Sequence, residues 1–162
     1  MAIRNLRYEG DEILSKKSKP VDEITDKIKE IIKDMIDTMH KFDGVGLAAV
    51  QVGILKQIVV IDLYEEGKEP YVLINPKILK TKGIQTVDEG CLSFPNKFAK
   101  VERPEEVKVE ALDENGNKII IEGTGLLAQA IAHELDHLNG EVFIDKILPG
   151  TLEIVNQEAS KK

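Results

Sequence analysis

The sequence predicts an α+β fold, in which antiparallel or mixed β-sheets pack around a central helix in the C-terminal part of the chain. A second, amphipathic helix is expected near the N-terminus. Two observations lead to this prediction: apolar residues recur with helical spacing early in the chain, and several β-branched segments precede one late helical segment. The 162 residues suffice to bury a core and favour a single domain over residues 1–162, with a short tail over residues 150–162.

The first predicted helix covers residues 22–42. Its apolar side chains repeat at intervals of three and four residues, as in a helix that packs one face against a core. The residues in this pattern are Ile24, Ile28, Ile31, Ile32, Met35, Ile36 and Met39. Asp43 and Gly44 end the helix, with glycine where a left-handed cap costs little. His40 is expected at the surface, where a cation suits the helix dipole.

The middle of the chain contains segments typical of strands. Residues 57–63 form a β-branched run that indicates a buried strand. Residues 71–75 form another, which Pro76 is expected to stop because proline cannot donate to a sheet. Residues 78–87 are predicted to be extended and more polar.

A hairpin and a helix are predicted next. Residues 106–112 and 118–122 are strand-like, and the Asp-Glu-Asn-Gly-Asn turn at residues 113–117 joins them into a hairpin. The late helix is expected over residues 126–138, with Thr124 as a suitable N-cap. Its leucine and isoleucine side chains predict that it packs into the core.

Composition narrows the class of protein. The net charge of −7 argues against a basic nucleic-acid surface, so no DNA partner is expected. A membrane span needs about 20 apolar residues, and no run approaches that length. The N-terminus lacks a signal-type apolar run, and the single cysteine fits a reducing compartment. A soluble, cytoplasmic protein is therefore expected.

The most informative motif is His-Glu-Leu-Asp-His at residues 133–137, within the predicted late helix. His133 and His137 lie one helical turn apart on one face, so both imidazoles can bind one divalent metal. Glu134 between them can reach a water on that metal. This arrangement activates water for hydrolysis.

A hydrolytic metal usually has three protein ligands and one open position, so a third ligand is required. The extended protease pattern HExxHxxGxxH is excluded, because Gly140 fits it but Phe143 stands where the last histidine should be. A downstream carboxylate, Glu153 or Glu158, would make the chain a zinc peptidase. The remaining candidate is the one thiol, Cys91.

The surroundings of Cys91 favour a ligand role. Gly90 allows close backbone approach, and Pro95 stiffens the segment that follows. A bound cation deprotonates a thiol outright, so no separate base is needed. One thiolate and two neutral imidazoles would leave a divalent site with a net charge of about +1.

Three segments in this order and spacing resemble the peptide deformylase family. They are Gly-Val-Gly-Leu-Ala-Ala-Val-Gln at residues 44–51, Glu-Gly-Cys-Leu-Ser at residues 89–93 and the motif at residues 133–137. The resemblance extends over about residues 3–149. It implies an enzyme that removes the formyl group from the N-terminal formyl-methionine of nascent polypeptides and releases formate.

The resemblance also implies the metal and its ligands. Cys91, His133 and His137 would bind iron(II), with zinc, nickel or cobalt able to substitute. From sulfur and imidazole donors alone, zinc would be expected. A monomer is expected. Because the tail is short, any contact with the ribosome, through Lys161 and Lys162, is expected to be weak.

The motif makes Glu134 the expected general base, and the resemblance adds the Gln51 amide and the Leu92 backbone N–H as stabilisers of the oxyanion. Val45, Gly46 and Gly90 would line the peptide cleft. The methionine pocket would comprise Val45, Val87, Leu126, Gln129 and Ala130. Glu89 and Arg103 would form an ion pair that supports the cysteine segment.

Two positions depart from the family pattern, and one non-catalytic reading stays open. Ala132 precedes the first histidine where glutamine is usual, and Gly10 stands where proline is common. A packing change alone is expected at Ala132. A metal-binding domain without activity is the remaining alternative, but it would have no use for the water-activating carboxylate of Glu134.

Overall fold

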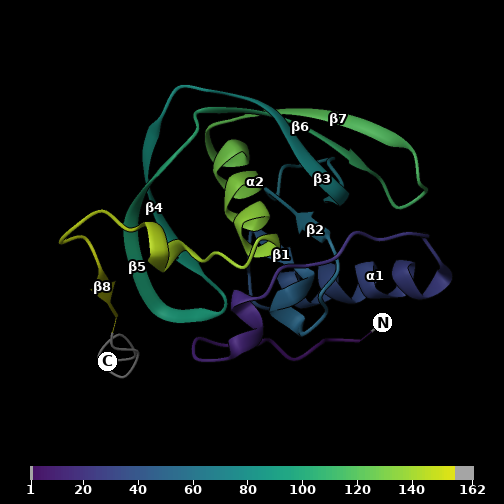
Figure 1. The fold of residues 1–162 in the computed structure, drawn as a ribbon, viewed down its shortest axis with the longest axis horizontal. Helices are drawn as coiled ribbons and strands as arrows, with labels where there is room; N and C mark the ends of the chain where they lie inside the picture. The colour runs from purple at the N-terminus through teal and green to yellow at the C-terminus, as the bar shows by residue number, and fades with distance from the viewer. Residues whose placement is uncertain (1, 156–162) are drawn as a thin grey trace.

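The computed structural model of the chain describes residues 2–155 and shows an α+β fold with antiparallel strand pairs (Figure 1). The predicted fold class is confirmed at this level, and every pair of named strands is antiparallel rather than mixed. No helix among the described residues is long and apolar enough to cross a membrane. Short 3-10 turns also occur: η1 (Glu12–Ser15), η2 (Ala49–Val52) and η3 (Phe143–Lys146).

The first helix, α1 (Asp26–Lys41), begins later than residue 22. Its start is set by Thr25, whose side-chain oxygen accepts a hydrogen bond from the Ile28 N–H at 3.3 Å. Its end also differs from the prediction: Asp43, with φ of 55°, takes the left-handed position expected for Gly44. Aspartate tolerates this conformation better than most residues because its short side chain can bond locally.

The larger sheet has five strands in the order β1-β2-β3-β6-β7. They are β1 (Gly46–Ala48), β2 (Ile58–Ile61), β3 (Tyr71–Lys82), β6 (Glu106–Leu112) and β7 (Lys118–Thr124). The β6–β7 hairpin forms as predicted, closed by the Asp113 N–H bonding to the Asn117 carbonyl at 2.9 Å. Pro76 does not stop its strand, so that prediction was wrong. The pairing register shifts between Ile74 and Lys77, and such an irregularity accommodates a residue without an N–H.

The apolar run of β2 is explained by burial on both of its faces. Ile58 and Val60 belong to a cluster with the buried face of α1. Val59 and Ile61 point the other way, into a cluster with the second long helix, α2 (Gly125–Leu138). The five-stranded sheet is thus covered by one helix on each face.

The smaller sheet contains β4 (Gln85–Cys91), β5 (Phe94–Arg103) and β8 (Glu153–Ile154) in that order. The extended segment predicted at residues 78–87 is divided between β3 and β4, with Gly83 in the left-handed region at φ of 69°. Strand β5 was not predicted, since Pro95 and several charged residues obscure its pattern. Its alternating burial appears only once it pairs with β4.

Helix α2 lies between the two sheets, as Figure 1 shows, and most of its residues are buried. It begins at Gly125 and ends at Leu138, close to the predicted range. Thr124 occupies the N-cap position, but its side chain makes no capping hydrogen bond. His133, Glu134 and His137 therefore reach the protein interior on a helix that both sheets hold in place.

We expect Gly140→Ala to destabilise the protein more than glycine-to-alanine changes at other left-handed positions. Gly140 has φ of 76°, and an added Cβ would lie 2.4 Å from the Ser15 backbone oxygen. The control is Gly150→Ala, because Gly150 has φ of 77° and nothing within 4 Å of the added atom. The left-handed conformation alone costs about 1–2 kcal/mol.

Thermal unfolding measures both effects. For a chain of this size, each kcal/mol lowers Tm by about 2–4 °C. Gly150→Ala should show only the conformational cost, and Gly140→Ala should show at least about 2 kcal/mol more, because backbone atoms must move. Equal Tm values for the two variants would mean that the α2–η1 contact is looser than described.

Candidate metal centre and active site

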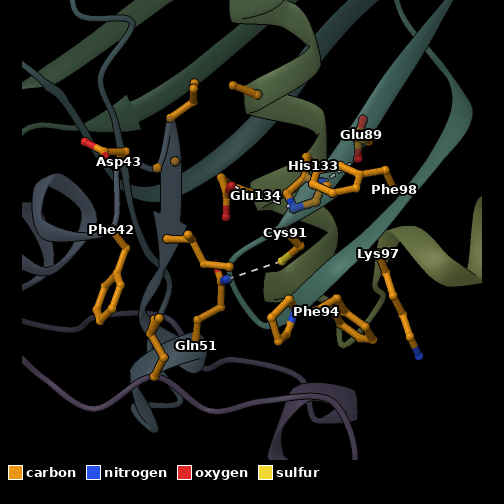
Figure 2. A pocket seen from close by; sticks show the side chains of 18 of the residues that line it. Phe42, Asp43, Gln51, Glu89, Cys91, Phe94, Lys97, Phe98, His133 and Glu134 are labelled. Carbon is orange, nitrogen blue, oxygen red and sulfur yellow. Dashed lines mark hydrogen bonds and ion pairs between the residues drawn. The ribbon is translucent and has the colours of Figure 1, made fainter. Parts of the chain in front are cut away.

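A cleft of about 670 Å³ opens between the start of β1, the β4–β5 hairpin and α2. Figure 2 shows the side chains around it: Gln51 from η2, Cys91 from β4, and His133 and Glu134 from α2. A volume of this size is typical of sites that enclose a small-molecule or short peptide ligand.

Three possible metal ligands converge at the base of this cleft. The donor atoms of Cys91, His133 and His137 lie within 4.8 Å of one another. The Cys91 Sγ is 3.4 Å from the His137 Nε2, and the two imidazole centroids are 5.0 Å apart. The two histidines lie on α2, whereas Cys91 is the last residue of β4 in the smaller sheet. A register shift between Gly90 and Cys91 redirects this end of the strand.

The orientation of His133 is fixed by a buried hydrogen-bond network. Its Nδ1 lies 2.5 Å from the Glu89 Oε1, which leaves Nε2 to face the other donors. Arg103 donates to both Glu89 oxygens, at 2.8 and 2.7 Å, and to Asp136 Oδ2 at 2.6 Å. Burial opposes ionisation of Glu89, but the hydrogen bonds from Arg103 and His133 lower its pKa to about 2. Glu89 therefore stays an acceptor that holds the ring in place.

The charges around the cluster suit a cation. Burial lowers the pKa of His133, but the Glu134 carboxylate, the Cys91 sulfur and Glu89 outweigh burial and raise that pKa well above its ordinary value. Burial, with His133 and Arg103 nearby, lowers the pKa of His137 to about 3, so its imidazole is neutral. A neutral imidazole and a sulfur beside anionic groups fit a divalent metal.

Glu134 is placed beside these donors and is buried. Its Oε2 is 3.9 Å from the His133 Nε2, and its Oε1 has no hydrogen-bond partner among residues 2–155. Burial raises the pKa of Glu134 to about 7, with His133 opposing and Glu89 reinforcing that shift. Such a carboxyl group can exchange a proton near neutral pH.

Gln51 is held with its amide nitrogen toward the cysteine. Its Oε1 accepts the Ala48 N–H at 2.9 Å, and its Nε2 donates to the Ser93 Oγ at 3.2 Å. The same nitrogen is 3.5 Å from the Cys91 Sγ, the contact drawn as a dashed line in Figure 2. The amide donor thus points into the reactive end of the cleft. Leu92 lines the same wall.

Most residues that the sequence assigned to substrate binding line this cleft. They are Val45, Gly46, Gly90, Leu126, Gln129 and Ala130. Val87 is not among its lining residues and packs instead against an apolar cluster that contains Phe94 and Phe143.

Several site residues were not predicted. Ser93 accepts a hydrogen bond from Gln51, and Asp136 accepts one from Arg103. The only sequence feature that could have indicated these two residues is their position within the two motifs. Phe42 and Phe98 flank the cleft from opposite walls (Figure 2), and nothing in the sequence separates them from other exposed aromatic residues.

The competing third ligand, Glu153, lies elsewhere. It is exposed on β8 and pairs with Phe98 on the edge of β5, outside the residues that line the cleft. The other carboxylate candidate, Glu158, falls outside the described residues.

These features together define the class of a metal-dependent hydrolase: two imidazoles and a sulfur meet beside a buried carboxylate in a peptide-sized cleft. Comparison with known proteins makes the class specific. The family model for polypeptide deformylase matches residues 3–152. The chain therefore belongs to the polypeptide deformylase family, as the sequence motifs indicated, and it is an enzyme that removes the N-formyl group from peptides.

Relatives and solved structures agree over nearly the whole chain. Peptide deformylase from Lachnoclostridium phytofermentans is 50% identical over 162 residues, covering 100% of this chain and 99% of that one. Peptide deformylase 1 from Clostridium perfringens is 53% identical over 145 residues, covering 90% and 98%. The Legionella pneumophila enzyme superposes with a TM-score of 0.88 at 44% identity, covering 91% and 88%. The Synechococcus elongatus enzyme, solved with actinonin, gives 0.88 at 47%, covering 91% and 82%.

We expect Glu89→Gln to weaken metal binding. The Gln amide cannot match a carboxylate as the acceptor for His133 Nδ1, and loss of such a partner typically costs about 10- to 100-fold in metal affinity. Asp88→Asn is the matched control, because Asp88 is the exposed neighbour and its carboxylate pairs, within residues 2–155, only with Lys100. Competition with a chelator measures both affinities. If both variants bind metal as the unchanged protein does, Glu89 has no part in orienting the ligand.

Proposed function

We propose that Cys91, His133 and His137 hold one divalent metal and that this chain deformylates N-formyl-methionyl nascent polypeptides at that centre. The observation that carries the proposal is the meeting of a β4 sulfur with two α2 imidazoles next to the buried Glu134. The family resemblance favours iron(II), and zinc, nickel or cobalt can occupy the same donors. When bound, such a metal would lower the pKa of a bound water to about 7 and polarise a carbonyl.

Glu134 is the proposed proton carrier. Its unpartnered Oε1 is available to take a proton from the attacking water and to return it to the departing amine. The raised pKa of Glu134, about 7, suits both directions of transfer near neutral pH. The contact of the other oxygen, Oε2, with the His133 Nε2 at 3.9 Å supports this role, because it shows the carboxyl group beside one of the donors.

Gln51 and Leu92 are the proposed oxyanion stabilisers. The hydrogen bond from the Ala48 N–H fixes which end of the Gln51 side chain is the donor, so Nε2 faces the reacting carbonyl. A neutral amide donates without titrating, and the Leu92 backbone N–H would add a second donor. One such preorganised donor is typically worth about 10²–10³ in rate.

The substrate is proposed to lie between two glycine-containing walls. Its backbone would pair with Val45 and Gly46 on one side and Gly90 on the other, as an added strand does. The methionine side chain would enter the slot formed by Val45, Leu126, Gln129 and Ala130. We further propose a single catalytic domain, a monomer, a cytoplasmic location and a weak ribosome contact through Lys161 and Lys162, which lie outside the described residues.

We expect Glu134→Gln to abolish most turnover while the metal stays bound. The amide cannot accept the proton, and loss of general acid–base transfer costs about 10²–10⁴ in kcat. Glu141→Gln is the control, because Glu141 is an exposed carboxylate in the segment that follows α2. Formate release and metal content are measured together. Turnover at the unchanged rate in Glu134→Gln would refute the proton-transfer role.

We expect Cys91→Ser to lose metal, and Glu153→Gln to keep it. A serine hydroxyl is a far weaker ligand than a thiolate, and the cobalt form should also lose its sulfur-to-metal absorption. Formyl-methionyl, acetyl-methionyl and internal-bond peptides serve as substrates for the unchanged enzyme. The peptidase alternative predicts the reverse: metal loss in Glu153→Gln and cleavage of internal bonds.

A further inference from the structure

A cluster outside the cleft, formed by His40, Asp62 and Tyr64, contacts the backbone just before β1. The Tyr64 hydroxyl donates to the Gly44 carbonyl at 2.6 Å, and the Asp62 backbone N–H donates to the Val45 carbonyl at 2.8 Å. Two successive carbonyls of the cleft wall are therefore held from the side away from the proposed substrate.

The members of this cluster also hold one another. The Asp62 carboxylate accepts the Tyr64 N–H at 2.7 Å through one oxygen and lies 2.7 Å from the His40 Nε2 through the other. The His40 and Tyr64 rings lie 5.6 Å apart between centroids. His40 lies in the last turn of α1, so the cluster connects that helix to the segment after β2.

Tyr64 adopts a backbone conformation that bulky residues avoid. Its φ is +56°, in the left-handed region, although its side chain is 52% exposed and gains little from burial. Such conformations persist where surrounding contacts over-determine them. Burial, with Asp62 and Asp43 nearby, raises the pKa of the Tyr64 hydroxyl, which keeps it protonated as a donor.

The segment that Tyr64 contacts has little freedom to shift on its cleft side. An added Cβ at Gly46 would lie 2.6 Å from the Glu134 Oε2, and one at Gly44 would lie 2.7 Å from the Leu92 Cδ1. The wall therefore touches the proposed base and the proposed oxyanion segment. A displacement of a fraction of an ångström would alter the width of the cleft.

We propose that Tyr64, supported by Asp62 and His40, is a positioning residue: by fixing the Gly44 and Val45 carbonyls it aligns the Val45–Gly46 backbone as a preformed edge for the substrate peptide. This inference rests on the proposed function, because it assumes that a peptide pairs with that edge. Tyr64 does not touch the reacting atoms. It sets the alignment of backbone groups that a substrate longer than formyl-methionine would meet.

The test is Tyr64→Phe, which removes only the hydroxyl. The substrates are formyl-Met-Ala-Ser, whose backbone reaches the wall, and formyl-methionine, whose backbone ends at the slot. We expect KM for the tripeptide to rise about three- to tenfold, as for loss of one hydrogen bond, with kcat changed by less than about twofold. KM for formyl-methionine should rise clearly less than that for the tripeptide, because formyl-methionine lacks the residues that would follow along the edge. Tyr71→Phe is the matched control, because the Tyr71 hydroxyl makes no hydrogen bond within residues 2–155.

Each outcome has a defined meaning. A tripeptide KM equal to that of the Tyr71→Phe control would overturn the inference, and so would an equal loss for both substrates, since a general structural defect does not depend on substrate length. Failure of the unchanged enzyme to release formate from either substrate would instead refute the proposed function. Thermal unfolding of both variants separates a folding defect from a change in the wall.

Discussion

The geometry of the site depends on the buried ion pair between Arg103 and Glu89. Their side chains are only 3% and 4% exposed, so both charges have lost their hydration, at a cost of several kcal/mol per ion. Glu89 is compensated by two hydrogen bonds from Arg103 and one from His133, and Arg103 by a further bond to Asp136. Because apolar residues often replace a buried ion pair without loss of stability, stability does not account for this pair. It joins β4, β5 and α2 at the place where a β4 sulfur must meet the α2 imidazoles.

A contrast in hydrogen bonding separates the scaffold from the reactive groups. The scaffold groups, Glu89 and Arg103, have a hydrogen-bond partner within the protein for each of their polar side-chain atoms. The Glu134 Oε1 and the His137 Nδ1 are buried but unpartnered among the described residues, a state that costs about 1–3 kcal/mol for each group. Of the two residues, only Glu134 lines the cleft, where water and substrate can supply the missing partner. The Ser18 Oγ is also buried and unpartnered, and nothing in the structure explains it.

The sequence could predict the parts of the site that lie within one helix, because helical spacing relates them. The other parts depend on the pairing of distant strands, which the sequence pattern does not contain. His133 and His137 share a face because they are four residues apart, a relation that the sequence contains. The position of Cys91 beside the two histidines depends on the pairing of β4 with β5. Strand β5 was not predicted, because Pro95 near its start is unusual in a strand. The same limit explains Pro76, where a register shift in the β3–β6 pairing absorbs the proline that seemed to end a strand. Roles for Gln51 and Leu92 came from family resemblance, since an amide in a loop carries no local signal.

The glycines of the cleft are required by space rather than by backbone conformation. Gly44, Gly46 and Gly90 have no unusual φ, yet an added Cβ at each would lie 2.7, 2.6 and 2.7 Å from the side chains of Leu92, Glu134 and Phe98. The walls of the cleft thus approach the reactive groups closely only because these positions lack side chains. Under the proposed pairing, a peptide bound between them meets mostly backbone groups, which are the same for every sequence. Selection for methionine would then fall to one side-chain slot, and the alignment of the backbone edge would decide how well the rest of a nascent chain is held. Under the same proposal, the Tyr64 contact behind the wall acts on substrate binding through that alignment, although Tyr64 is remote from the metal ligands.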